Sequence, residues 1–131
     1  MRVSVELKGQ ESLSRLFKRA GEGNRNALAQ AMFFQANSIL NESKEIVPVD
    51  NGDLKKSGKV EKPKITSNRI SVDITYGGDA KAYAWIVHED PNAQHKDGQT
   101  YKYLEIPVNN NKDKFVDEVK KMFITYVKRG T

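Results

Sequence analysis

The order of hydrophobic and polar residues changes period several times along the chain. Val3, Val5 and Leu7 alternate with polar residues, which predicts a short strand with one buried face. Residues 10–20 then repeat apolar side chains at helical spacing, and Gly21 follows as a residue suited to a helix end. We therefore expect a strand and then a short helix.

A longer helical pattern occupies residues 24–45, which contain neither proline nor glycine. One apolar stripe runs along this segment and consists of Leu28, Ala31, Met32, Ala36, Ile39 and Ile46. Pro48 forces the residue before it out of helical geometry. The pattern predicts the longest helix of the protein, ending before Pro48 and forming the spine of the core.

The second half of the chain begins with the period of strands. Apolar residues alternate with polar ones from Ile70 to Tyr76, and Ser67 and Asn68 supply turn residues ahead of them, so residues 60–76 predict a hairpin. After Gly77 and Gly78, the apolar run 82–87 predicts a central strand. The polar run 91–100 predicts a loop.

The last segment again has helical spacing. The polar run 109–111 is suited to capping a final helix. Its wide apolar face consists of Phe115, Val116, Val119, Met122, Phe123, Tyr126 and Val127. Since no repeat or linker divides the chain, we expect one α+β domain, with an antiparallel sheet packed against one long and one C-terminal helix.

Composition narrows the class of protein. The chain has 131 residues, of which 30% are charged, and it contains no cysteine. Disulfides and thiolate chemistry are thereby excluded, and synthesis in a reducing cytoplasm is expected. No apolar run is long enough to cross a membrane. A net charge of +5 is compatible with nucleic acid or with an acidic protein partner.

The segment 47–57 has the clearest local logic. With Asp50 as the cap of a short helix, Asp53 falls at the third helical position, and Val49 and Leu54 are spaced as a hydrophobic staple. This pattern favours a structural corner over a calcium site or a catalytic site. The predicted corner consists of Pro48, Val49, Asp50, Gly52, Asp53 and Leu54.

The same segment begins a resemblance to a known family. Three blocks in this order resemble the tail-completion and neck proteins of siphophages, often described as minor capsid or tail-component proteins. The first block is Pro48, Val49, Asp50, Gly52, Leu54, Lys55 and Ser57. The second is Tyr83, Ala84, Val87, His88 and Glu89, and the third is Lys102, Tyr103, Leu104, Glu105 and Pro107.

The resemblance implies a structural subunit of the bacteriophage head–tail connector, not an enzyme, and no cofactor or metal. Such a subunit forms a homo-oligomeric ring, with a hexamer favoured over a dodecamer. The ring lies between the head-closure protein and the tail-terminator or tail-tube protein, around the channel for DNA. The expected location is the virion neck, after assembly in the host cytoplasm.

The segment 88–103 is long for a simple connection, so we interpret it as a docking element, with a plain solvent loop as the alternative. The candidate interface residues are Trp85, His88, Glu89, Asp90, His95, Tyr101, Lys102 and Tyr103. For Trp85, packing in the core is the favoured alternative. A metal site at His88, Glu89 and His95 would lack a third histidine ligand. A hydrolase that uses these residues would lack a predicted pocket.

Basic residues gather in the segment 55–69, where Glu61 is the one acid. They are Lys55, Lys56, Lys59, Lys62, Lys64 and Arg69. Three interpretations remain open, namely solvated or edge-guarding charges, contact with an acidic partner, and contact with DNA. The last supports the alternative function, a small basic nucleic-acid-binding protein, whereas the ring subunit would bind DNA non-specifically at most.

Overall fold

The computed structural model describes residues 3–8, 22–48, 53–66, 70–77, 84, 87–91 and 101–129. In chain order its elements are β1 (Val3–Lys8), α2 (Glu22–Ile46), α3 (Asp53–Ser57), β2 (Lys59–Val60), β3 (Lys64–Ile65), β4 (Ile70–Tyr76) and α5 (Glu105–Arg129). The helix expected at 10–20 lies outside the described residues. Helices and an antiparallel sheet share one fold, which confirms the α+β prediction.

Strand β4 is the centre of the sheet. β1 pairs antiparallel with one edge of β4, from Val3 opposite Tyr76 to Lys8 opposite Ser71. β2 and β3 both pair antiparallel with the other edge, so the sheet order is β1-β4-β2 with β3 also beside β4. The first strand and the hairpin predicted for residues 60–76 are therefore confirmed.

The edge formed by β2 and β3 is interrupted by a bulge. Val60 pairs with Ile74 and Lys64 with Ser71, so the edge strand has three residues where β4 has two. This extra residue makes a β-bulge, and Pro63 within it lacks an amide hydrogen. Both features hinder pairing with a further strand.

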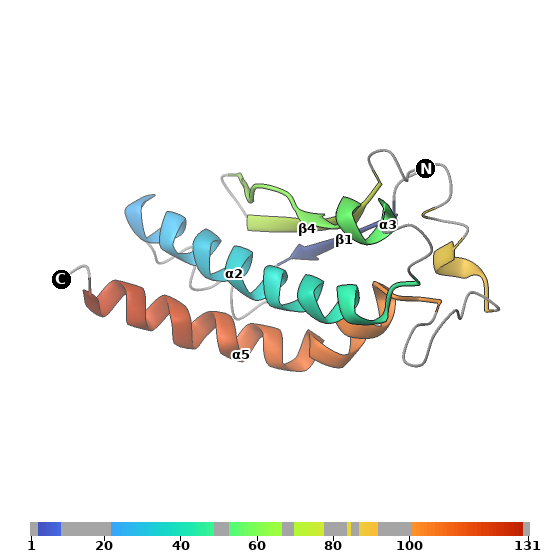
Figure 1. The fold of residues 1–131 in the computed structure, drawn as a ribbon. Coiled ribbons are helices and arrows are strands. Elements are labelled where there is room, and N and C mark those ends of the chain that lie inside the picture. Colours follow the sequence, from blue (N-terminus) through green and yellow to red (C-terminus); the bar gives the residue numbers. More distant parts are fainter. Residues whose placement is uncertain are drawn as a thin grey trace.

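The two long helices lie side by side in opposite directions and pack against the sheet (Figure 1). The apolar face of α2 and the alternate apolar residues of β4 supply most of the core. Its buried members include Leu28, Met32, Ala36, Ile39, Leu40, Val72, Ile74, Tyr76, Phe115, Val119 and Phe123. The predicted apolar stripe of α2 is thus confirmed, and so is the apolar face of α5 from Phe115 to Phe123, whereas Tyr126 of the predicted face is exposed.

The end of α2 follows from Pro48. The amide of Val47 donates to the carbonyl of Ser43 at 3.0 Å, and Pro48, which has no amide hydrogen, is buried directly after it. The next helix, α3, begins at Asp53, and Leu54 is buried in the core. Val49, Asp50 and Gly52 lie outside the described residues, so the cap remains a prediction.

The strand predicted for residues 82–87 is wrong. Both described residues of this run, Ala84 and Val87, are helical, and β4 is the central strand. Short apolar runs do not distinguish a buried strand from a buried helical turn, because neither period can repeat within them. The run was assigned by its apolar content alone, and this signal is common to both structures.

The predicted start of the last helix is also wrong. α5 begins at Glu105 and includes the run 109–111 that we expected to cap it. Pro107 is compatible with this start because the first turn of a helix needs no amide hydrogen at that position. Asn111 instead donates from Nδ2 to the carboxylate of Glu42 and to the carbonyl of Pro107, both at 2.7 Å.

Gly58 lies where α3 meets the core. A Cβ atom at this position would be 2.8 Å from Cε1 of Tyr76 and 3.1 Å from Cδ1 of Leu40. We expect Gly58→Ala to lower the free energy of unfolding by about 1–3 kcal/mol through overpacking. Urea denaturation checks this, with Ser38→Ala on the exposed side of α2 as control. Equal midpoints for the two variants would contradict the close packing.

Candidate functional site

Segments far apart in the sequence meet at the end of β4. Ser57, at the end of α3, donates from its hydroxyl to the carbonyl of Leu54 at 2.7 Å and accepts from the amide of Gly77 at 3.1 Å. Lys102 donates from its amide to the carbonyl of His88 at 2.7 Å. The first pair of bonds ties α3 to the end of the central strand, and the last ties the segment 87–91 to the start of α5.

Three rings in edge-to-face contact occupy the centre of this region, and we call Tyr76, His88 and Tyr103 the aromatic corner. The ring centroids of Tyr76 and Tyr103 are 4.9 Å apart at an interplanar angle of 82°. The rings of His88 and Tyr103 are also 4.9 Å apart, at 79°. Edge-to-face geometry of this kind adds to the stabilisation from burial.

Both tyrosine hydroxyls have partners inside the core. The hydroxyls of Tyr76 and Ser43 are 2.7 Å apart, and Tyr103 donates to the carbonyl of Ala84 at 2.7 Å. Burial raises the pKa of Tyr76 to about 12, against a smaller lowering by the Ser43 hydrogen bond. Burial also raises the pKa of Tyr103. Both side chains are therefore protonated at neutral pH and act as hydrogen-bonding elements of the fold.

His88 connects the turn at 87–91 to the first residue of α5. Its Nε2 atom accepts from the amide of Glu105 at 3.3 Å, and its Nδ1 atom lies 3.3 Å from Oε1 of Glu89. Burial lowers the pKa of His88, against smaller opposing effects of Glu89. A neutral ring with its proton on Nδ1 satisfies both contacts, so His88 accepts one of the amide hydrogens at the start of α5.

Lys102 lies at the surface of the corner. It has φ 56°, in the left-handed region, and its ammonium contacts the carboxylates of both Glu89 and Glu105. The hydrogen bond between Lys102 and Glu89 lowers the pKa of Glu89 and raises that of Lys102. All three side chains are partly or fully exposed, so solvent screens this ion-pair group and its contribution to stability is small.

The burial of His88 makes stability dependent on pH. Because its pKa is lower in the folded protein than the ordinary value of 6.5, the unfolded chain binds the proton first as the pH falls. The free energy of unfolding should therefore have its full value above pH 6.5 and should decrease as the pH falls below 6.5. We expect His88→Gln to weaken this decrease between neutral pH and the range where carboxylates titrate.

Chemical denaturation at a series of pH values measures the effect. His95→Gln is the matched control, since His88 and His95 are the two histidines of the chain. A His88→Gln variant with the acid dependence of the wild type, or a His95→Gln variant that alone loses it, would refute the role of His88.

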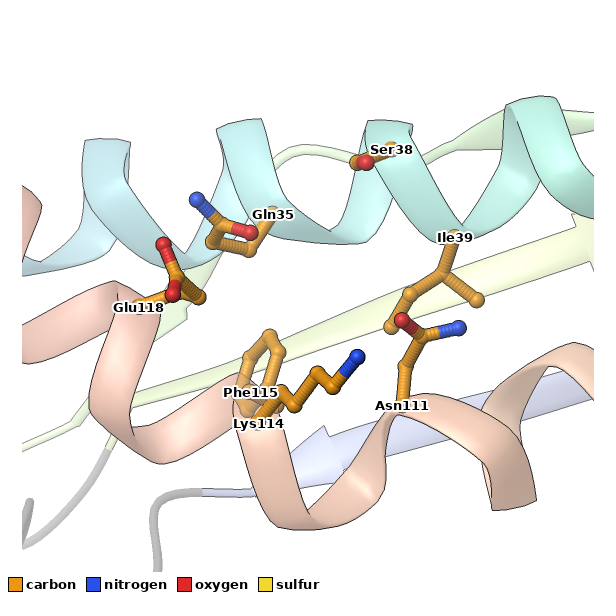
Figure 2. A pocket seen from close by; sticks show the side chains of 7 residues that line it. All are labelled: Gln35, Ser38, Ile39, Asn111, Lys114, Phe115 and Glu118. Carbon is orange, nitrogen blue, oxygen red and sulfur yellow. The ribbon is translucent and has the colours of Figure 1, made fainter.

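A shallow pocket of about 250 Å³ opens between α2 and α5 (Figure 2). Two apolar and five polar side chains from the two helices line it. The lining residues are Gln35, Ser38, Ile39, Asn111, Lys114, Phe115 and Glu118. Lys114 and Glu118 are exposed and one turn apart, as expected for a solvated helix surface.

The predicted basic segment is exposed along the edge of the sheet. Lys55, Lys56, Lys59, Lys62 and Lys64 are all exposed, and Arg69 lies outside the described residues. Nζ of Lys64 is 3.3 Å from Oδ2 of Asp73 on β4. We call these five exposed lysines, which lie on α3 and along the β2–β3 edge, the basic edge.

The described residues hold neither a cluster of metal ligands nor a membrane-spanning helix. Within these ranges no three or more His, Cys, Asp or Glu side chains gather as metal ligands would. The helices in the same ranges include none with the length and apolarity that a bilayer span requires. His95, the third member of the hypothetical metal site, lies outside the described residues.

The structure corrects part of the predicted interface. Tyr103 is 0% exposed and His88 is 5% exposed, so both pack inside the chain and leave no side-chain surface for a partner. Asp90 is exposed, while Glu89, Tyr101 and Lys102 are partly exposed and stay candidates for contact. Trp85 and His95 lie outside the described residues, and their interface role stays a prediction.

Two participants in the corner were missed from the sequence. Tyr76 was recognised as a strand residue and Ser43 was not singled out at all. Ser43 lies four residues after Ile39, on the apolar stripe of α2, and it is fully buried. A lone hydroxyl on an apolar stripe indicates a buried hydrogen-bond partner, and that was the available signal.

Comparison with known proteins gives no relative for this chain: no family model, curated protein or solved structure matches it.

Proposed function

We propose that this protein is a structural subunit of the phage head–tail connector, in the neck or tail-completion ring. The observation that carries the proposal is the meeting of the three resemblance blocks in one place. Ser57 of the first block holds Gly77 at the end of β4. Ala84 of the second block accepts from Tyr103 of the third, and Glu89 pairs with Lys102.

These contacts give the residues of the three blocks a common structural role. Residues of the second and third blocks are in direct contact, since Tyr103 donates to Ala84 and Lys102 pairs with Glu89. The first block reaches the same core through Leu54 and the end of β4 through Ser57. These contacts support a structural role for the three blocks, as a family signature would have.

The proposed role is mechanical. A rigid body of two long helices on a sheet presents fixed surfaces to identical neighbours, and a ring requires a fixed angle between such surfaces. We propose a hexamer, with a dodecamer as the alternative, between the head-closure protein and the tail-terminator or tail-tube protein. The virion neck is the proposed location, with DNA passing through the channel.

Co-sedimentation tests this role. The protein should sediment with purified head-closure or tail-terminator protein of the same phage, in a complex that persists at moderate salt. Lys121→Ala, on the exposed surface of α5, serves as control and should sediment as the wild type does. Sedimentation of the wild type as a free chain in every mixture would contradict the proposal.

A second candidate function is supported by the basic edge. Its five exposed lysines lie within residues 55–64, close enough together to contact the phosphates of one duplex. A nucleic-acid-binding protein would then lose affinity steeply with salt, with a slope of about −0.9 per phosphate contact on a log–log plot. For the ring subunit we expect weak DNA binding without sequence preference, which disappears at moderate salt.

A further inference from the structure

The outer side of α2 carries no charge over most of its length. Residues 26–41 contain no Asp, Glu, Lys or Arg, in a chain of which 30% is charged. In the middle of this stretch Phe34 is 56% exposed. The exposed residues around it are Gln30, Ser38 and Asn41. A surface with a central aromatic residue and few charges is typical of the core of a protein interface.

A complementary feature lies on another side of the same helix. An apolar groove of about 320 Å³ runs between the first half of α2 and β3. Ile65 on its rim is 43% exposed, and Lys62 beside it is also exposed. The residues that line the groove are Asn26, Ala29, Gln30, Phe33, Lys62, Pro63 and Ile65.

Phe34 and the groove face different directions. Consecutive helical residues are about 100° apart, and Phe33 lines the groove whereas Phe34 does not. One copy can therefore insert Phe34 into a neighbour while its own groove stays open to another copy. This is a head-to-tail contact, which closes into a ring when the rotation between copies allows it.

Charged residues toward the C-terminal end of α2 also agree with a head-to-tail contact. On the outer side of α2, the exposed Glu45 follows Phe34 by about 16 Å along the helix axis. On the side with the groove, Gly58 lies against Leu40, so the exposed Lys55, Lys56 and Lys59 lie toward the same end of α2. From the N-terminal toward the C-terminal end of α2, the outer side thus carries Phe34 and then the negative Glu45. The other side carries the groove and then the positive lysines.

We infer that the groove between α2 and β3 of one copy receives Phe34 of a second copy of this chain. The two copies lie in the same direction, so that Glu45 of one faces the basic edge of the other. The inference rests on the self-assembly of the proposed function and names its contact. A second copy is the favoured occupant because this one chain carries both Phe34 and the groove. It also carries Glu45 and the basic edge, in matching order along α2.

Cysteine cross-linking tests the contact, and the absence of native cysteine gives it a clean background. Ser38→Cys, which keeps Phe34 and lies one turn from it, and Ile65→Cys are made in separate chains, mixed, and treated with a short bis-maleimide. The control mixture combines Ser38→Cys with Thr125→Cys, an exposed position on α5. Each single variant is also treated alone, and a third mixture adds Phe34→Asp to the Ser38→Cys chain, which then has no aromatic side chain to insert into the groove.

We expect about tenfold more covalent dimer from the Ser38→Cys and Ile65→Cys mixture than from the control mixture, a ratio that a modest contact energy produces. Ser38→Cys alone should stay at the control level, and so should the mixture in which the Ser38→Cys chain also carries Phe34→Asp. Equal yields in the first two mixtures, or strong self-linking of Ser38→Cys, would overturn the inference.

These outcomes are separate from those that test the proposed function. A ring in solution without the expected cross-link would leave the connector proposal standing and remove this contact. The expected cross-link without any complex with neck proteins would retain the contact and contradict the connector proposal.

Discussion

Tyr103→Ala should lower the free energy of unfolding by about 3–5 kcal/mol, the range for removal of a buried aromatic side chain. Tyr103 is fully buried, and its ring contacts those of Tyr76 and His88. Truncation also removes the hydrogen bond to the carbonyl of Ala84. Since small domains have about 5–15 kcal/mol in total, this variant should be close to unfolding at moderately raised temperature.

Tyr103→Phe is the matched variant, because it keeps the ring and removes the hydroxyl. It should lose only about 1 kcal/mol, the usual net value of one hydrogen bond, plus the desolvation of the Ala84 carbonyl. Urea midpoints and thermal unfolding of both variants measure the difference. If Tyr103→Ala were as stable as Tyr103→Phe, the ring would not pack as described and the corner would not hold the fold together.

Leu28→Ala and Phe34→Ala, two changes on α2, should have very different effects. Leu28 is buried in the core, and its truncation should lower the free energy of unfolding by about 2–5 kcal/mol. Phe34 is exposed, and its truncation should change the stability of the isolated chain by less than about 0.5 kcal/mol. The larger side chain is therefore expected to have the smaller effect.

Denaturation at low protein concentration makes this comparison, because dilution removes any contribution from contacts between copies. A repeat at high concentration adds a second readout, in which wild type should gain stability and Phe34→Ala should not. A large loss of stability for Phe34→Ala in dilute solution would show that Phe34 supports the fold, and its exposure would then need no partner.

Periodicity predicted the elements that repeat for several turns or alternations. The stripe from Leu28 to Ile46 gave α2 almost to its ends, and the alternation from Ile70 to Tyr76 gave β4. The run 82–87 was misassigned because it is too short to show a period. The start of α5 was misplaced because asparagines favour caps in general, whereas the hydrogen bonds at Pro107 and Glu42 keep Asn111 inside the helix.

The candidate site was less accessible from sequence than the fold. Tyr103 and His88 are amphipathic, and amphipathic residues after a long polar run suggest a surface. Their burial depends on Tyr76 and Ser43, which are distant in the chain and approach only when β4 lies against α2. Sequence patterns within a segment do not encode such pairs, whereas the three resemblance blocks did include residues from most of the segments that meet there.

Phe34 lies outside the apolar stripe predicted for α2, and the pattern alone gave no reason to single it out. Its exposure follows from the helical register alone, since Phe33 and Phe34 cannot both face the sheet. The absence of charge around it is visible in the sequence once the register is known.

Light scattering measures most directly whether this chain assembles as proposed. The mass of the 14.8 kDa chain is determined alone and in mixtures with neck and tail-terminator proteins of the same phage, at low and moderate salt. We expect a discrete hexamer or dodecamer, either alone or in the mixture, that persists at moderate salt. A monomer that ignores these proteins and gains mass only with DNA at low salt would contradict the connector role and favour nucleic-acid binding.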